Sequence, residues 1–234
     1  WKSLMSARTA IARAGPRILQ TCSSNPFSST RIAILRRPPM VFASSRGADA
    51  FQGSTVDDLR TYLTAHGVDA TTWGGQTSSK SLTCLLTEIL AGETLLQCVD
   101  GEPLRQVSVI SVEIKNNQGQ RLFETEQRLP TGVVRQRHLL LSEKLLPNES
   151  WAAASRRGIR EELGSVLPTN ARIEVLDDTY ESRTETRTSG SYPGLKTQYL
   201  CHKVEARVSG LPDGSFVTTE QRPDGLLQSS WSWM

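Results

Sequence analysis

One short segment, residues 149–164 (ESWAAASRRGIREELG), holds side chains whose types and spacing could carry out chemistry. It begins with Glu149, places Arg157 eight positions later, and ends with the pair Glu161 and Glu162 followed by Gly164. Carboxylate oxygens gathered on one face are the ligands that Mg²⁺ or Mn²⁺ prefers, and such an ion neutralises a pyrophosphate and activates water. The residues alone leave two interpretations open: a metal-dependent site that cleaves phosphate bonds, or a solvated helix face on which Arg156, Arg157 and Arg160 form ion pairs with Glu161 and Glu162.

The element that must position these side chains is a helix predicted over residues 150–163. Ser150 can cap its N-terminus with its hydroxyl oxygen. Glu161 and Glu162 follow residue 158 by three and four positions, so the three positions share one helical face. Position 158 is a Gly, which brings no carboxylate to that face and costs a helix about 1 kcal/mol relative to Ala.

The segment resembles the Nudix box, G-x5-E-x7-R-E-U-x-E-E-x-G-U, in which U is a bulky apolar residue. The positions that match are Glu149, Arg157, Ile159, Glu161, Glu162 and Gly164. Three positions depart from the box: Glu143 replaces its leading Gly, Gly158 replaces the Glu after the Arg, and Ser165 replaces the final apolar residue. The chain looks like plant and algal Nudix proteins with a degenerate box, over roughly residues 104–233.

The resemblance implies a Nudix-like α/β/α sandwich with a mixed β-sheet. It also implies that Glu161 and Glu162 are metal ligands and catalytic residues, and that Arg157 and Glu149 orient the helix and its loop by a salt bridge. Gly164 would be a structural position of the box. A further carboxylate from outside the box is common in the family, and the candidates are Asp177, Asp178, Glu181, Glu185, Glu205 and Glu220.

Hydrophobic periodicity independently predicts a mixed α/β class with one sheet. Two helices, within 54–67 and 81–92, precede three or four strands, the helix at 150–163, and two or three further strands. The apolar run 104–114 predicts either a central strand buried on both faces or a strand with a bulge near Val109. We expect a short helical region at 49–103 and a Nudix-like domain at 104–234.

The first 48 residues have the composition of an organellar transit peptide. They contain eight basic residues and no acidic one, and they are rich in Ser and Ala. The stretch MVFASS at 40–45 is similar to a plastid cleavage site, and a cut after Ala43 would change the net charge from +3 to −4. We expect a chloroplast location, with the mitochondrion as the alternative. A basic arm that binds nucleic acid is the other reading of this region.

These observations favour a pyrophosphatase that hydrolyses a small nucleoside-diphosphate-linked substrate with Mg²⁺ or Mn²⁺. The alternative is a catalytically inactive Nudix-fold module that binds a nucleotide or a protein, which the missing carboxylate at Gly158 supports. A third alternative, an RNA-associated organellar component, rests on the basic leader alone and loses that support if the leader is removed. No run approaches the roughly 18 apolar residues that span a membrane, and the sequence indicates no oligomeric state.

Overall fold

The structure is a computed structural model that describes residues 50–75, 79–222 and 225–234. The expected transit peptide, 1–48, lies outside these residues. The helices are α1 (Val56–Ala65), α2 (Leu82–Leu90) and α3 (Trp151–Leu163). The strands are β1 (Leu95–Val99), β2 (Glu102–Ile114), β3 (Leu122–Arg128), β4 (Val134–Leu139), β5 (Leu141–Lys144), β6 (Ile173–Thr188), β7 (Lys196–Val208), β8 (Phe216–Arg222) and β9 (Gly225–Trp233). The mixed α/β class is confirmed.

Each helix begins at a hydroxyl residue that accepts a hydrogen bond from a free backbone N–H. Thr55 forms a capping box with Asp58 at the start of α1, and Ser81 caps α2 through the N–H of Cys84. Ser150 caps α3 through the N–H of Ala153. Because the first N–H groups of a helix have no partner within the helix, these side chains fix where each helix starts.

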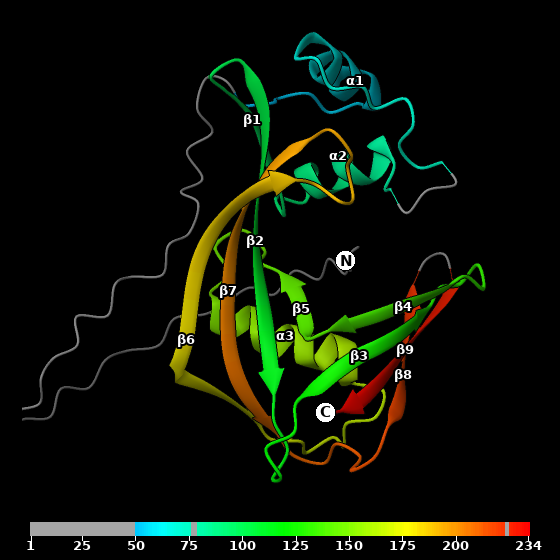
Figure 1. Ribbon diagram of the computed structural model, residues 1–234, viewed down its shortest axis with the longest axis vertical. Helices are drawn as coiled ribbons and strands as arrows, with labels where there is room; N and C mark the ends of the chain where they lie inside the picture. The colour runs from blue at the N-terminus through cyan, green and yellow to red at the C-terminus, as the bar shows by residue number, and fades with distance from the viewer. Residues whose placement is uncertain (1–49, 76–78, 223–224) are drawn as a thin grey trace, which may run out of the picture.

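A five-stranded mixed sheet forms one side of the molecule (Figure 1). Its order is β1-β2-β7-β6, with β5 also paired to β2. β2 and β7 are parallel in continuous register from Leu104 to Ile114, while the other pairs are antiparallel. The unbroken register excludes a bulge near Val109, and β2 is a central strand with buried residues on both faces.

The expectation of one sheet is wrong, because the remaining strands form a second, antiparallel sheet in the order β4-β3-β9-β8. The extended segment 134–144 is divided at Leu140 into β4 in the second sheet and β5 in the first. β1 was also not expected as a strand. It is joined to β2 through Asp100 and Gly101, both with positive φ, in the Asp-Gly turn that matches the twist of a hairpin.

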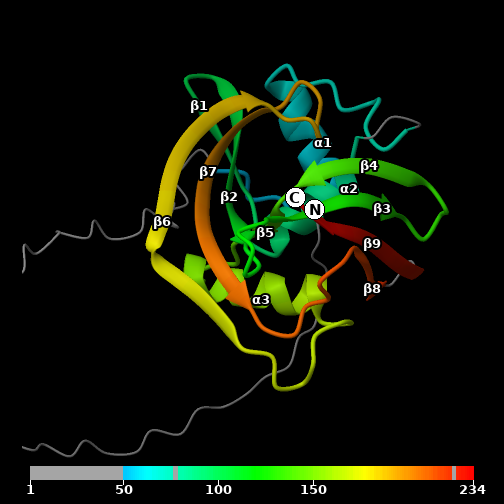
Figure 2. The ribbon, with the colours of Figure 1, turned by 60° about the horizontal axis from the view of Figure 1, so that its bottom comes forward.

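Helix α3 packs against strands of both sheets, among them β2 and β5 of the first and β8 of the second (Figure 2). Its buried residues Ala154, Ile159 and Leu163 join a core with apolar side chains of β2, β5 and β7 and with Trp231 of β9. A second core lies around α1, α2 and Leu96 of β1. Within the described ranges, no helix is both long and apolar enough to cross a membrane.

Candidate active site

Arg157 lies at the centre of the predicted box and contacts three parts of the chain. Its Nε and Nη2 atoms bind the two carboxylate oxygens of Glu149 at 2.9 and 3.0 Å. Nη2 also donates to the carbonyl oxygen of Lys144 at 2.7 Å, and Nη1 lies 3.0 Å from Oε2 of Glu161. The planar guanidinium of Arg157 binds both oxygens of the Glu149 carboxylate, and this two-bond contact, the Arg157–Glu149 fork, fixes the relative orientation of the two side chains as well as pairing their charges. Through its bond to the Lys144 carbonyl oxygen, Arg157 also ties α3 to the end of β5.

Glu149 also shapes the loop between β5 and α3. Its Oε2 accepts a hydrogen bond from the backbone N–H of Leu146 at 2.9 Å. The carboxylate thus joins the loop backbone to the Arg157 side chain. Burial opposes the charged form of Arg157, but the hydrogen bonds that it donates to Glu149, together with the charges of Glu143, Glu149 and Glu161, outweigh burial and raise the pKa of Arg157 above its usual value.

Gly164 follows the last residue of α3. A Cβ at this position would overlap the carbonyl oxygen of Arg160, so no residue other than Gly fits without a shift of the backbone. The three positions assigned to the structural part of the box, Glu149, Arg157 and Gly164, thus each have a geometric reason for their residue type.

The two predicted metal ligands differ in their surroundings. Glu161 has a side chain that is 47% exposed and paired with Arg157. Glu162 lies on the buried face of α3, together with Gly158. Glu161 is rotated by about 100° from Glu162 around the helix axis, so it lies at the edge of that face and reaches solvent while Glu162 points toward the sheets.

Glu143, on β5, is the acidic residue that sequence reasoning missed as part of this site. It is 2% exposed, its Oε1 lies 3.8 Å from Nη1 of Arg157, and its Oε2 has no hydrogen-bond partner. Burial, and then the charges of Glu161 and Glu162, raise the pKa of Glu143 from 4.5 to about 7, although Arg157 acts in the opposite direction. One signal was available in the sequence: two of the three departures from the box are a Glu in place of Gly and a Gly in place of Glu.

The acidic candidates outside the box include three that are paired with basic neighbours. Glu205 binds Lys115 at 2.7 Å, Glu220 lies 3.3 Å from Arg222, and Glu185 lies 3.3 Å from Arg187. The structure therefore gives each of these three an ion pair outside α3. Asp177, Asp178 and Glu181 lie on β6, where its register with β7 shifts between Leu176 and Glu181.

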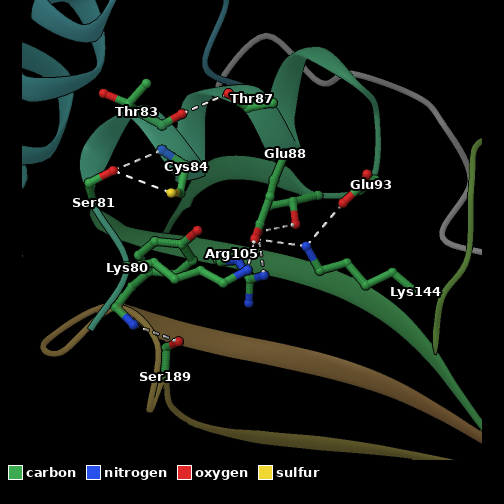
Figure 3. Close-up of polar contacts among 12 residues, drawn as sticks. Lys80, Ser81, Thr83, Cys84, Thr87, Glu88, Glu93, Arg105, Lys144 and Ser189 are labelled. Carbon is green, nitrogen blue, oxygen red and sulfur yellow. Dashed lines mark hydrogen bonds and ion pairs between the residues drawn. The ribbon is translucent and has the colours of Figure 1, made fainter. Parts of the chain in front are cut away.

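A cluster of charges around Glu88 of α2 contacts Lys144 at the end of β5 (Figure 3). Glu88 of α2 lies 2.8 Å from Nζ of Lys144, 2.9 Å from Arg105 and 2.7 Å from Lys80. Glu93 adds a second carboxylate to Lys144 at 3.0 Å. Burial disfavours the charged form of Glu88, but Lys144 and the other two cations outweigh it and lower its pKa. These ion pairs cross the expected boundary between 49–103 and 104–234.

A divalent cation of the kind that the resemblance implies fits the donor set of this site. Carboxylate oxygens are the ligands that hard cations take, and the buried oxygen Oε2 of Glu143 lacks a partner. Within the described part of the chain, however, no three His, Cys, Asp or Glu side chains lie close enough together to hold an ion. Binding would require Glu161, which is half exposed, to turn away from Arg157.

No family model matches this chain, and no curated protein matches it. Among solved structures, a Nudix hydrolase from Nitrosomonas europaea matches 54% of this chain and 72% of its own, with 21% identity and a TM-score of 0.32. The Nudix hydrolase RenU from M. smegmatis matches 55% and 70%, with 14% identity and a TM-score of 0.27. Likenesses this distant carry no argument about function.

Proposed function

We propose that this chain is a Nudix-type hydrolase that uses Mg²⁺ or Mn²⁺ to cleave a diphosphate within a small nucleoside-diphosphate-linked substrate. The observation that carries the proposal is the Arg157–Glu149 fork, which ties the box loop to α3 one helical turn before Glu161 and Glu162. An ordinary charged helix needs no such anchor to a preceding loop. The spacing and the anchor together support a site built to hold carboxylates in place.

In this proposal the residues of the chain have separate roles. Glu161 and Glu162 hold the cation, which when bound neutralises the diphosphate and lowers the pKa of a bound water. Arg157 and Glu149 keep the loop and helix in register and do not touch the reacting atoms. The exposure of Glu161 gives the substrate phosphates access from solvent. The buried position of Glu162 limits its movement and keeps one ligand fixed.

A second candidate function, a module that binds a nucleotide or a protein without catalysis, is favoured by two observations. Gly158 brings no carboxylate to the helix, and Arg157 already neutralises Glu161. A guanidinium at this position competes with a divalent cation for the same carboxylate. This candidate predicts ligand binding that is independent of metal.

The test uses the full chain, titrated with Mn²⁺ by calorimetry and assayed on several dinucleotide and nucleotide-sugar diphosphates. We expect metal-dependent turnover that falls at least about a hundredfold in Glu161→Gln/Glu162→Gln. A matched control, Glu102→Gln/Glu174→Gln, removes two exposed carboxylates that also pair with basic residues, and it should keep full activity. Absence of both Mn²⁺ binding and turnover would exclude the enzyme. Turnover unchanged in the first double variant would exclude this site.

We also propose that residues 1–48 direct the protein to the chloroplast. Their lack of acidic residues and their Arg, Ser and Ala content support this location. Residues 1–48 fused to a fluorescent protein should be imported by isolated chloroplasts and shortened near Ala43. Uptake by mitochondria alone would establish the alternative location instead.

A further inference from the structure

Two of the departures from the box face each other in space. Glu143 lies on β5 and Gly158 on α3, and a Cβ built on Gly158 would lie 3.1 Å from Cβ and 3.5 Å from Cγ of Glu143. It would also lie 3.3 Å from Cδ2 of Leu141. A side chain at 158 and the glutamate at 143 therefore compete for the same space, and this chain places the carboxylate on the strand.

The carboxylate of Glu143 is not explained by packing. Its residue is 2% exposed, and its Oε1 accepts only from the N–H of Lys144, at 3.1 Å, while Oε2 accepts no hydrogen bond at all. A buried polar atom without a partner costs about 1–3 kcal/mol, and more if it is charged. An apolar side chain would fill the same space without that cost, so the position of this carboxylate indicates a ligand.

We propose that Glu143 supplies, from β5, the carboxylate that the box helix lacks at Gly158, and that it binds the divalent cation together with Glu161 and Glu162. This inference rests on the proposed function. Glu161 and Glu162 lie one turn beyond Gly158 on the helix against which Glu143 packs, so an ion at this point could meet oxygens from both elements. The unpartnered Oε2 is the donor atom that such an ion would take.

Among the described basic residues, only Arg157 lies within 4.0 Å of the Glu143 carboxylate. Its Nη1 atom lies 3.0 Å from Oε2 of Glu161 but 3.8 Å from Oε1 of Glu143, beyond hydrogen-bond distance. Nε and Nη2 remain held by Glu149 and by the carbonyl oxygen of Lys144. Glu161 can therefore leave Arg157 for a metal ion while the fork that anchors the loop stays intact.

The remaining box carboxylate is less available than Glu143. Both oxygens of Glu149 bind Arg157, and its Oε2 also accepts from the N–H of Leu146. To bind a cation, Glu149 would have to release the loop that it holds. Glu143 gives up no strong contact.

The test measures Mn²⁺ binding to the full chain by calorimetry, with no substrate present. Glu143→Gln keeps the side-chain volume and removes the charge, and we expect it to weaken Mn²⁺ binding by about tenfold or more. The exchange variant Glu143→Gly/Gly158→Glu moves the carboxylate from the strand back to the helix. We expect it to bind Mn²⁺ within about threefold of the original chain, because the two positions share one space. Glu174→Gln, on β6 and 49% exposed, is the control and should change nothing.

The outcomes separate this inference from the proposed function. If Glu143→Gln binds Mn²⁺ as tightly as the original chain while Glu161→Gln/Glu162→Gln loses binding, the inference is wrong and the proposed function stands. An exchange variant that is folded by circular dichroism but binds no better than Glu143→Gln also overturns the inference. If the original chain binds no Mn²⁺, the inference is overturned, and the proposed function is overturned with it when turnover is absent as well.

Discussion

Glu143 gives the fold a dependence on pH that can be measured without metal. Burial comes first among the causes that raise its pKa from 4.5 to about 7, followed on the raising side by Glu161 and Glu162, while Arg157 lowers it. The folded protein therefore binds a proton more tightly at this group than the unfolded chain does. The stabilisation that the protonated Glu143 carboxyl gives the folded state is therefore complete below pH 4.5 and is lost as the pH rises to 7. A difference of about 2.5 pH units corresponds to about 3 kcal/mol in the free energy of unfolding.

The perturbation is Glu143→Gln, which keeps the shape of the side chain and cannot ionise. In urea denaturation with a metal chelator, we expect the variant to become more stable relative to the original chain by up to about 3 kcal/mol between pH 4.5 and 7.5. Tryptophan fluorescence can follow the transition, since Trp231 is 1% exposed in the core. A difference between the two proteins that stays constant over this range would refute the burial of an ionisable carboxyl at this position.

A second buried group titrates in the same range but in the opposite direction. Burial lowers the pKa of His202 from 6.5 to about 4, so the unfolded chain binds the proton more tightly. The contribution of His202 is complete above pH 6.5 and is lost as the pH falls toward 4. Because both proteins contain His202, its effect cancels in the difference, and only the comparison with Glu143→Gln isolates the carboxyl.

Two further substitutions test the contacts that hold the site. Glu88→Gln should lower the free energy of unfolding by about 3–5 kcal/mol, because it leaves buried Lys144 short of a counterion. In the same denaturation experiment, the control Glu102→Gln, at an exposed ion pair, should change the free energy of unfolding by less than about 1 kcal/mol. Equal effects of the two substitutions would contradict the role of the ion pairs around Glu88. Arg157→Lys should cost about 1–3 kcal/mol, because an ammonium cannot bind both oxygens of Glu149, and an unchanged urea midpoint would show that the fork adds no stability.

The helices could be predicted from local chemistry. The hydroxyl residues Thr55, Ser81 and Ser150 stand where α1, α2 and α3 begin, and capping acts within a few residues of sequence. The predicted range 150–163 differs from the observed Trp151–Leu163 only by its capping residue. The start of each helix could be predicted because the capping residue and the N–H that it binds are only three positions apart in the sequence.

The division into two sheets could not be predicted in the same way. Residues 134–144 are a mixture of apolar and polar side chains on extended backbone. Leucine at position 140 is neither a Gly nor a Pro, so nothing in the sequence marks the change from one sheet to the other. Strand partners are set by contacts across the fold, such as the parallel register between β2 and β7. Sequence periodicity reports which face of a strand is buried and does not report which strand lies beside it.

The candidate site was predicted in part for the same reason. Glu149, Arg157, Glu161 and Glu162 follow one another along a single loop and helix, so their spacing was enough to group them. Glu143 comes from the strand before that loop, and only the fold brings it against Gly158. Glu143 and Gly158 are two separate departures from the box in the sequence, but they face each other in the fold, and the carboxylate stands on the strand instead of the helix.

Strand β5 has a consequence for any attempt to divide this protein into parts. Neighbouring side chains of a strand point to opposite faces, so Lys144 enters the charge cluster of α2 while Glu143 packs against α3. A shortened chain that begins at residue 104 would lack Glu88 and Glu93 and would leave the Lys144 ammonium buried without them. If such a chain lost activity, the cause would be the displacement of β5, and the loss would not show that α1 and α2 contact the substrate.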